Sequence, residues 1–95
     1  MKRIYYRLHT EFQETLEIIV SAYFECFAIF KGRGYWHRVG EDAACIEIIG
    51  TEADRVTVLE LAAAIQKLYA QEAVYVSVTP CELVDMRGAV YAQSA

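Results

Sequence analysis

The feature that most restricts the possible folds of this chain is the spacing of its apolar residues. Segments with the period of a strand and segments with the period of a helix follow one another in a definite order. Residues 3–9 place their larger apolar side chains on one face at every second position, which predicts a strand. Apolar residues then recur at helical spacing, and Thr10 with Gln13 matches a capping box. We therefore expect a helix over about 11–24.

The rest of the chain adds a second helix between further strands. Strands are expected at about 26–31, 43–49 and 73–79. Asp54 is a suitable N-cap for a helix that continues to about Tyr69 and carries one apolar stripe. Pro80 is expected to stop the last strand, and residues 83–86 are a candidate short edge strand.

This order of elements, βαββαβ, predicts an α+β fold of the ferredoxin-like type. Such a fold has a four-stranded antiparallel sheet with both helices on one face. A chain of 95 residues buries a modest share of its surface, so we expect one domain over residues 1–95 and no second domain.

The charge balance excludes some classes of partner. The formal net charge is -4, which opposes the release of counterions from phosphates on which non-specific nucleic-acid binding depends. The acidic residues Glu11, Glu14 and Glu17 interrupt any signal-peptide core near the start, and no apolar run reaches the length of a membrane span. We expect a cytoplasmic protein that binds neither nucleic acid nor membrane.

The few cysteines and histidines give no pattern of a metal or disulfide site. Cys26, Cys45 and Cys81 are odd in number and widely spaced, so we expect reduced and mostly buried thiols. His9 and His37 have no second histidine or cysteine at ligand spacing, so no metal or other cofactor is predicted.

The sheet face away from the helices is predicted to carry large side chains, among them Tyr5, His9, Phe30, Ile49 and Tyr75. A soluble monomer rarely exposes such a patch, and a symmetric homo-oligomer would cover it. The alternative is that the fold tolerates large residues there. With an oligomer, clefts between subunits become candidate sites.

The segment from Lys31 to Asp42 concentrates unusual residues in twelve positions. It holds three glycines, Tyr35 and the only tryptophan, Trp36. We interpret it as a glycine-rich connection between the two central strands, with no Walker A or dinucleotide motif. Its aromatic side chains either pack back onto the core or offer a stacking surface for a base or a cation.

Charged residues in the same segment complete the candidate site. Of the two acidic residues, Glu41 is the stronger candidate for ligand binding, because a carboxylate beside aromatic rings can bind a ribose hydroxyl or balance the charge of a cation. Asp42 is a second candidate, but it also fits a solvated residue at the start of a strand. Arg33 and Arg38, with Lys31, suit an anionic group of a ligand, although each can equally be solvated. No arrangement of serine, histidine and acid supports nucleophilic hydrolysis.

The order βαββαβ, together with Gly34-Tyr35-Trp36 before Glu41 and a last strand that begins with residues 71–76, resembles the PII and CutA-like superfamily. The likeness covers about residues 3–79 and concerns topology and loop position. It implies a trimer that binds small-molecule ligands at the boundaries between subunits.

Within that superfamily the chain is similar to phage-encoded S-adenosylmethionine lyases. The likeness rests on the acidic pair Glu41-Asp42 directly before an apolar strand and on the Gln-acid-x-Val-x-Val pattern from Gln71 to Val76. It implies that the carboxylate of S-adenosylmethionine displaces its own thioether, giving methylthioadenosine and homoserine lactone, with an acidic residue matching Glu41 or Asp42 supporting the ribose. A phage origin would place the protein in the host cytoplasm.

Four functions follow from these features. The first is binding of an adenosine-type metabolite between subunits, most specifically cleavage of S-adenosylmethionine, with Glu41 as the catalytic residue and with Tyr35, Trp36, Asp42, Arg33 and Arg38 as substrate-binding residues. The alternative is a non-catalytic PII-like nucleotide-binding regulator or a phage protein that sequesters a nucleotide. A third is a protein-interaction module that docks through its aromatic sheet face, and a CutA-like metal role is a fourth.

Overall fold

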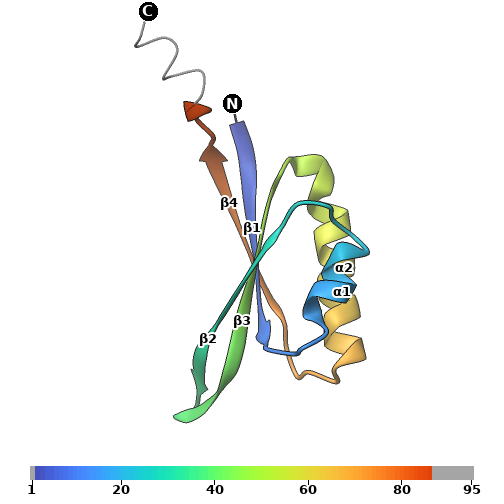
Figure 1. Cartoon of the computed structure of the whole chain (residues 1–95), viewed down its shortest axis with the longest axis vertical. Helices are drawn as coiled ribbons and strands as arrows, with labels where there is room; N and C mark the ends of the chain where they lie inside the picture. The colour runs from blue at the N-terminus through green and yellow to red at the C-terminus, as the bar shows by residue number, and fades with distance from the viewer. Residues whose placement is uncertain (1, 87–95) are drawn as a thin grey trace, which may run out of the picture.

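The computed structural model describes residues 2–86 as a four-stranded antiparallel sheet with two helices on one face (Figure 1). The elements are β1 (Lys2–Glu11), α1 (Leu16–Ser21), β2 (Ala28–Trp36), β3 (Val39–Gly50), the short 3-10 helix η1 (Glu52–Asp54), α2 (Arg55–Leu68) and β4 (Tyr75–Glu82). The strand order is β2-β3-β1-β4. This arrangement confirms the predicted ferredoxin-like α+β fold.

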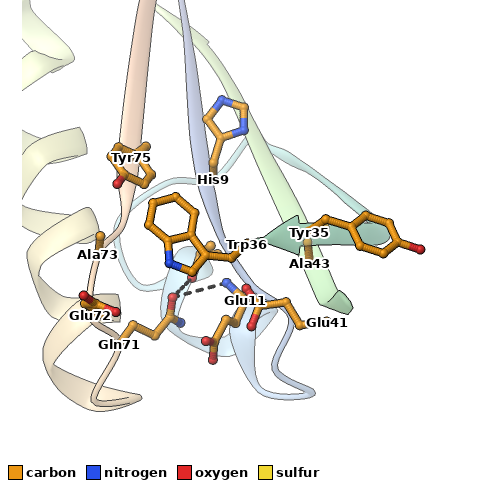
Figure 2. A pocket seen from close by; sticks show the side chains of 12 residues that line it. His9, Glu11, Tyr35, Trp36, Glu41, Ala43, Gln71, Glu72, Ala73 and Tyr75 are labelled. Atoms are coloured by element: carbon orange, nitrogen blue, oxygen red, sulfur yellow. Dashed lines mark hydrogen bonds between the residues drawn. The ribbon is translucent and has the colours of Figure 1, made fainter. Parts of the chain in front are cut away.

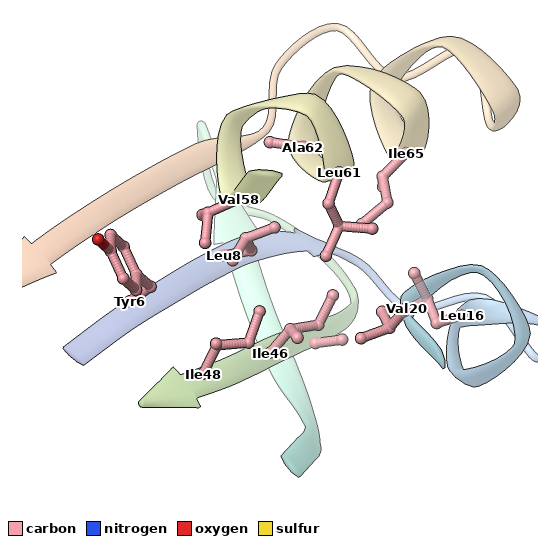
Figure 3. Packing of buried hydrophobic residues seen from close by; sticks show 11 residues of the cluster. Tyr6, Leu8, Leu16, Val20, Ile46, Ile48, Val58, Leu61, Ala62 and Ile65 are labelled. Atoms are coloured by element: carbon pink, nitrogen blue, oxygen red, sulfur yellow. The ribbon is translucent and has the colours of Figure 1, made fainter. Parts of the chain in front are cut away.

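The hydrophobic core lies between the two central strands and the helices (Figure 3). Every second residue of β1 and β3 points into it, and α2 contributes one apolar stripe. Its fully buried side chains are Tyr6, Leu8, Leu16, Val20, Ile46, Ile48, Val58, Leu61 and Ile65. Because each such side chain contributes about 1.5–3 kcal/mol relative to exposure, this layer provides most of the driving force for folding.

The segment predicted as a glycine-rich loop is instead a β-hairpin. β2 continues to Trp36 and β3 begins at Val39, which leaves only His37 and Arg38 in the turn. The prediction was wrong because the backbone pairs through the glycines: a Cβ on Gly34 would lie 3.1 Å from the Ala43 Cβ, so a glycine there allows the strands to approach closely.

The first helix is much shorter than predicted. It covers only Leu16–Ser21, and the expected capping box does not form, because Thr10 belongs to β1 and donates its hydroxyl hydrogen to Gln71 Oε1 at 2.5 Å. Strand pairing continues through Glu11 opposite Ala43. The Phe12 N–H then donates to the Asp42 carbonyl at 2.9 Å. Pairing with β3 thus prevails over local helix signals in this segment.

The last strand also departs from its prediction. β4 runs to Glu82 through Pro80, which lies opposite Ile4. Proline is tolerated because β4 is an edge strand, where one side makes no ladder hydrogen bonds. Within residues 2–86 no strand follows Glu82, so the candidate strand at 83–86 does not form.

The second helix lies where it was predicted, but the side chain of Asp54 does not cap it as expected. Asp54 is the N-cap residue of α2 without a side-chain capping bond of its own. Its carboxylate instead accepts a hydrogen bond from the Thr51 backbone N–H at 2.8 Å, as part of a capping box around η1. The strand-to-helix connection is thereby fixed one turn earlier than the sequence indicated.

The face of the sheet opposite the helices carries large side chains, as predicted, and no helix within residues 2–86 covers it. Phe30, Ile49 and Tyr75 are exposed on it. The Arg7 guanidinium lies 4.4 Å from the centre of the Tyr5 ring and 3.7 Å from the Glu47 carboxylate. We call this surface the open face.

Two smaller expectations can also be compared with the described residues. Cys26 is exposed while Cys45 and Cys81 are half-buried, so the thiols are free but less buried than expected. Within residues 2–86 no helix is long and apolar enough to cross a membrane.

The hairpin turn gives a stability prediction. His37 and Arg38 have φ values of 49° and 69°, the left-handed region that asparagine and glycine occupy at lower cost. We expect the double substitution His37→Asn, Arg38→Gly to raise the free energy of unfolding by about 1 kcal/mol, measured by urea denaturation. Lys31→Gly, which places glycine within β2, should lower it by about 0.5–1 kcal/mol. A loss of stability in the double variant would contradict the turn geometry.

Candidate functional site

A cleft of about 420 Å³ lies where the β2–β3 hairpin, the end of β1 and the α2–β4 connection meet (Figure 2). Its lining includes His9, Glu11, Trp36 and Tyr75, which all belong to the open face by strand register. The cleft therefore opens onto the same surface that carries the exposed aromatic residues.

The α2–β4 connection reaches the cleft through an unusual end of α2. Ala70 has a φ of 51°, a conformation that glycine normally supplies after a helix. The Ala70 N–H donates to the Lys67 carbonyl at 3.3 Å and the Gln71 N–H to the Gln66 carbonyl at 3.0 Å, which is the Schellman pattern. This reversal directs Gln71 back toward the end of β1.

Gln71 joins the α2–β4 connection to the sheet. Its side-chain oxygen accepts hydrogen bonds from the Thr10 hydroxyl at 2.5 Å and from the Glu11 backbone N–H at 3.2 Å. Thr10 and Gln71 are the two buried polar residues of the described chain. On the other side of the connection, Gln66 Nε2 donates to the Glu72 carbonyl at 3.0 Å. The floor of the cleft is therefore well fixed.

The cleft is acidic. Glu11, Glu41 and Glu72 contribute carboxylates, and none of the described residues that line the cleft is a lysine or an arginine. Burial raises the pKa of Glu11, and the neighbouring Glu41 carboxylate raises this pKa further. Such a site attracts a cation or a hydrogen-bond donor and repels an anion.

Two aromatic side chains stand at the mouth of the cleft. Trp36, at 54% exposure, projects among the lining residues, and Tyr75 lies near it in Figure 2. Trp36 is held at its outer side by an edge contact with His37, with ring centroids 5.1 Å apart. The ring of Tyr35 points away from that of Trp36, as expected for neighbours on a strand (Figure 2).

The structure separates the predicted site residues into two groups. Glu41, Trp36 and Tyr35 line the cleft. Arg33, Asp42 and Arg38 do not: Arg33 pairs with Asp42 at 3.3 Å, and Arg38 lies in the hairpin turn. Lys31 is also directed elsewhere, since its ammonium lies 4.4 Å from the centre of the Phe12 ring. The predicted basic cluster is thus not part of the cleft of this protomer.

Several lining residues had other interpretations in the sequence. Gln71 and Glu72 belong to the pattern that begins the last strand, Tyr75 to the aromatic sheet face, and Glu11 to the acidic residues that argue against a signal peptide. They converge only because β1 lies between β3 and β4 and ends beside the α2–β4 connection. Their adjacency in space has no counterpart in their sequence spacing. Among the described residues, no group of three metal-ligating side chains comes together.

Comparisons with known proteins give a fold but no family. No family model matches the chain, and no curated protein matches its sequence. The nitrogen regulatory PII-like protein CPII of Thiomonas intermedia, solved with ADP, AMP and bicarbonate, superposes with a TM-score of 0.63 at 12% identity, over 90% of this chain and 96% of that one. The chain has the fold of PII-like proteins.

Two further solved structures agree with this result. A DUF3240 family protein of Shewanella baltica gives a TM-score of 0.67 at 14% identity, over 87% of this chain and 93% of that one. CutA of Synechococcus elongatus, solved with Bis-Tris, gives 0.57 at 12% identity, over 98% and 90% of the two chains. The three solved structures therefore share the fold of this chain.

The raised pKa of Glu11 predicts a pH-dependent loss of stability. The folded state binds the Glu11 proton more tightly than the unfolded state, so stability falls as the pH rises above the ordinary value of 4.5. We expect Glu11→Gln to raise the free energy of unfolding at pH 7, and this gain should shrink as the pH falls below 4.5. Urea denaturation across pH measures it, with the exposed Glu14→Gln as a control for the loss of one charge. A variant less stable than the wild type at pH 7 would contradict the assignment.

Proposed function

We propose that this protein binds an adenosine-type metabolite that carries a positive charge, and that its most specific activity is the cleavage of S-adenosylmethionine. One observation carries the proposal: the cleft combines Glu11, Glu41 and Glu72 with the rings of Trp36 and Tyr75, and none of the described residues that line it is a lysine or an arginine. Carboxylates and aromatic faces both favour a sulfonium or ammonium group, and a flat purine can stack on an aromatic ring.

The proposed roles follow from the chemistry of each side chain. The Trp36 and Tyr75 rings offer a stacking surface for the base or a face for the sulfonium. Glu41, which projects from β3 beside Gly34, can accept hydrogen bonds from the ribose hydroxyls. With a volume of about 420 Å³, the cleft has the size typical of small-molecule sites.

The cleavage reaction needs neither a protein nucleophile nor a metal. A carboxylate oxygen of S-adenosylmethionine attacks the γ-carbon of its own methionine chain, and the bond between this carbon and sulfur breaks. Its electron pair stays on sulfur, which becomes the neutral thioether of methylthioadenosine, while the other product is homoserine lactone. No proton is transferred. The protein has to hold the substrate folded so that the carboxylate meets the carbon.

The charge change in this reaction limits what the carboxylates can do. The sulfonium loses its charge in the transition state, so a carboxylate that contacts sulfur would stabilise the substrate more than the transition state and slow the reaction. An aromatic ring attracts the sulfonium less strongly than a carboxylate does, so a ring beside sulfur opposes the loss of charge less. Glu41 is therefore assigned to the ribose, where it accepts hydrogen bonds from hydroxyl groups whose charge does not change during the reaction.

The activity is tested by incubating the purified protein with S-adenosylmethionine and measuring methylthioadenosine by liquid chromatography. We expect Glu41→Gln to reduce the rate by about 10- to 100-fold, the effect of losing charge-assisted hydrogen bonds. Glu60→Gln, an exposed position of α2 outside the cleft, is the matched control and should retain the wild-type rate. Absence of methylthioadenosine at high enzyme concentration would remove the enzymatic proposal.

A non-catalytic nucleotide-binding regulator is the second candidate, and one observation favours it: CPII, which shares the fold, was solved with ADP and AMP. Phosphates need positive charge, and within residues 2–86 no lysine or arginine lines the cleft of one protomer. Thermal-shift screening separates the candidates, because a specific ligand raises the melting temperature by mass action. Stabilisation by ATP, ADP or AMP alone would favour the regulator.

We also propose that the protein assembles as a homo-oligomer, and specifically a trimer, through the open face. Phe30, Ile49 and Tyr75 expose large apolar surface there, and the cleft opens onto the same face. A neighbouring copy packed on this face would cover the apolar surface and close the cleft, so that the ligand lies between subunits.

Assembly is tested by light scattering. We expect a mass three times the 10.8 kDa of one chain, and dissociation to monomers for the open-face double variant Phe30→Glu, Ile49→Lys. Ile18→Lys, at an exposed apolar position of α1, is the control and should leave the mass unchanged. A wild-type monomer would overturn the trimer and favour a module that docks a different partner on its aromatic face.

A further inference from the structure

Gln71, one of the residues that line the cleft, carries an unused hydrogen-bond donor, its amide nitrogen. Gln71 is only 8% exposed, and its Nε2 has no hydrogen-bond partner among the residues that the structure describes. A buried polar group without a partner costs about 1–3 kcal/mol, and native proteins contain few of them. A donor of this kind inside a ligand-sized cleft is a candidate contact for the ligand.

The direction of this donor follows from the bonds at the other end of the amide. The Glu11 backbone N–H can only donate, so the Gln71 atom 3.2 Å from it must be the oxygen. The Thr10 hydroxyl donates to the same oxygen. A flipped amide would place two N–H groups against each other. The orientation of the NH₂ group is therefore fixed by the backbone of β1.

The surroundings of Gln71 restrict what can accept its hydrogen bond. Glu11, Glu41 and Glu72 line the same cleft, so a carboxylate or phosphate of a ligand would be repelled there. A hydroxyl group of a ligand would bind these carboxylates in preference to the Gln71 amide, because it can donate its proton to them. An uncharged acceptor that has no proton to give, such as a ring nitrogen, matches the remaining donor.

We infer that Gln71 Nε2 donates a hydrogen bond to a ring nitrogen of the adenine base and thereby selects adenine. The inference rests on the proposed adenosine-type ligand and assigns the part of it that Gln71 recognises. Adenine carries a ring nitrogen acceptor next to an amino group, and a cleft carboxylate can accept from that amino group. Hypoxanthine and guanine have a carbonyl oxygen in place of this amino group, which the carboxylates repel.

The ligand base reaches this donor by displacing a side chain at the mouth of the cleft, because Nε2 is buried in the free protein. Trp36 and Glu72 are both exposed, so each has room to shift. A base seated against Gln71 would be shielded from water in turn, which strengthens its hydrogen bond. The cost of the unpaired donor in the free protein is removed when the base binds.

The test compares the binding of methylthioadenosine with that of its three deaza analogues, in each of which CH replaces one ring nitrogen, by isothermal titration calorimetry. We expect one analogue to bind the wild type about tenfold more weakly than the parent, the effect of one lost hydrogen bond. Gln71→Met, which removes the donor, should bind that analogue and the parent equally. Gln66→Met makes the same change on the other side of the α2–β4 connection and should keep the wild-type ratio.

Gln71→Glu is the second variant in case Gln71→Met unfolds. It keeps an oxygen for Thr10 and the Glu11 N–H but replaces the NH₂ donor by an acceptor, and at alkaline pH it should also lose the preference for the parent. An unchanged ratio in a folded Gln71 variant, or equal binding of all analogues by the wild type, overturns the role of Gln71 alone. If the wild type binds neither S-adenosylmethionine nor methylthioadenosine, this inference and the proposed function both fall.

Discussion

The burial of only one face of the sheet is the constraint on which the rest of this structure depends. Four strand residues are fully buried under the helices: Tyr6, Leu8, Ile46 and Ile48. Their neighbours in sequence lie on the opposite face, which no helix of the described residues covers. Because a strand alternates sides, the same residues that complete the core fix which side chains remain outside. The open face, with its aromatic surface, is a direct consequence.

The cleft forms where this open face meets the β2–β3 hairpin, the end of β1 and the α2–β4 connection. The hairpin projects Trp36 and Glu41, the end of β1 brings Glu11, and the reversed end of α2 brings Gln71. Each element is held by backbone pairing or capping that does not involve a ligand. The backbone of the cleft is therefore in place before binding, which lowers the ordering cost that a ligand has to offset.

The sequence predicted the element order well because strand and helix periods are local signals. It failed where long-range pairing prevailed over local propensity. Glycines suggested a loop, yet β2 and β3 pair through them, and Thr10 suggested a helix cap, yet it continues β1. Among the residues predicted from their types and position, Trp36 and Glu41 line the candidate cleft. Arg33 does not line it and pairs with Asp42, a contact that depends on the hairpin register and that the sequence did not indicate.

The sequence by itself determined the fold class, the acidic character of the chain and the residues of the open face, since these follow from periodicity and composition. Only the tertiary structure decided which polar groups meet. Thr10 and Gln71 are sixty-one positions apart, and their contact depends on the strand order and on a left-handed residue at Ala70. The element order implies the strand order, but no local pattern indicates the left-handed Ala70 or the contact itself, because both result from how the whole chain packs.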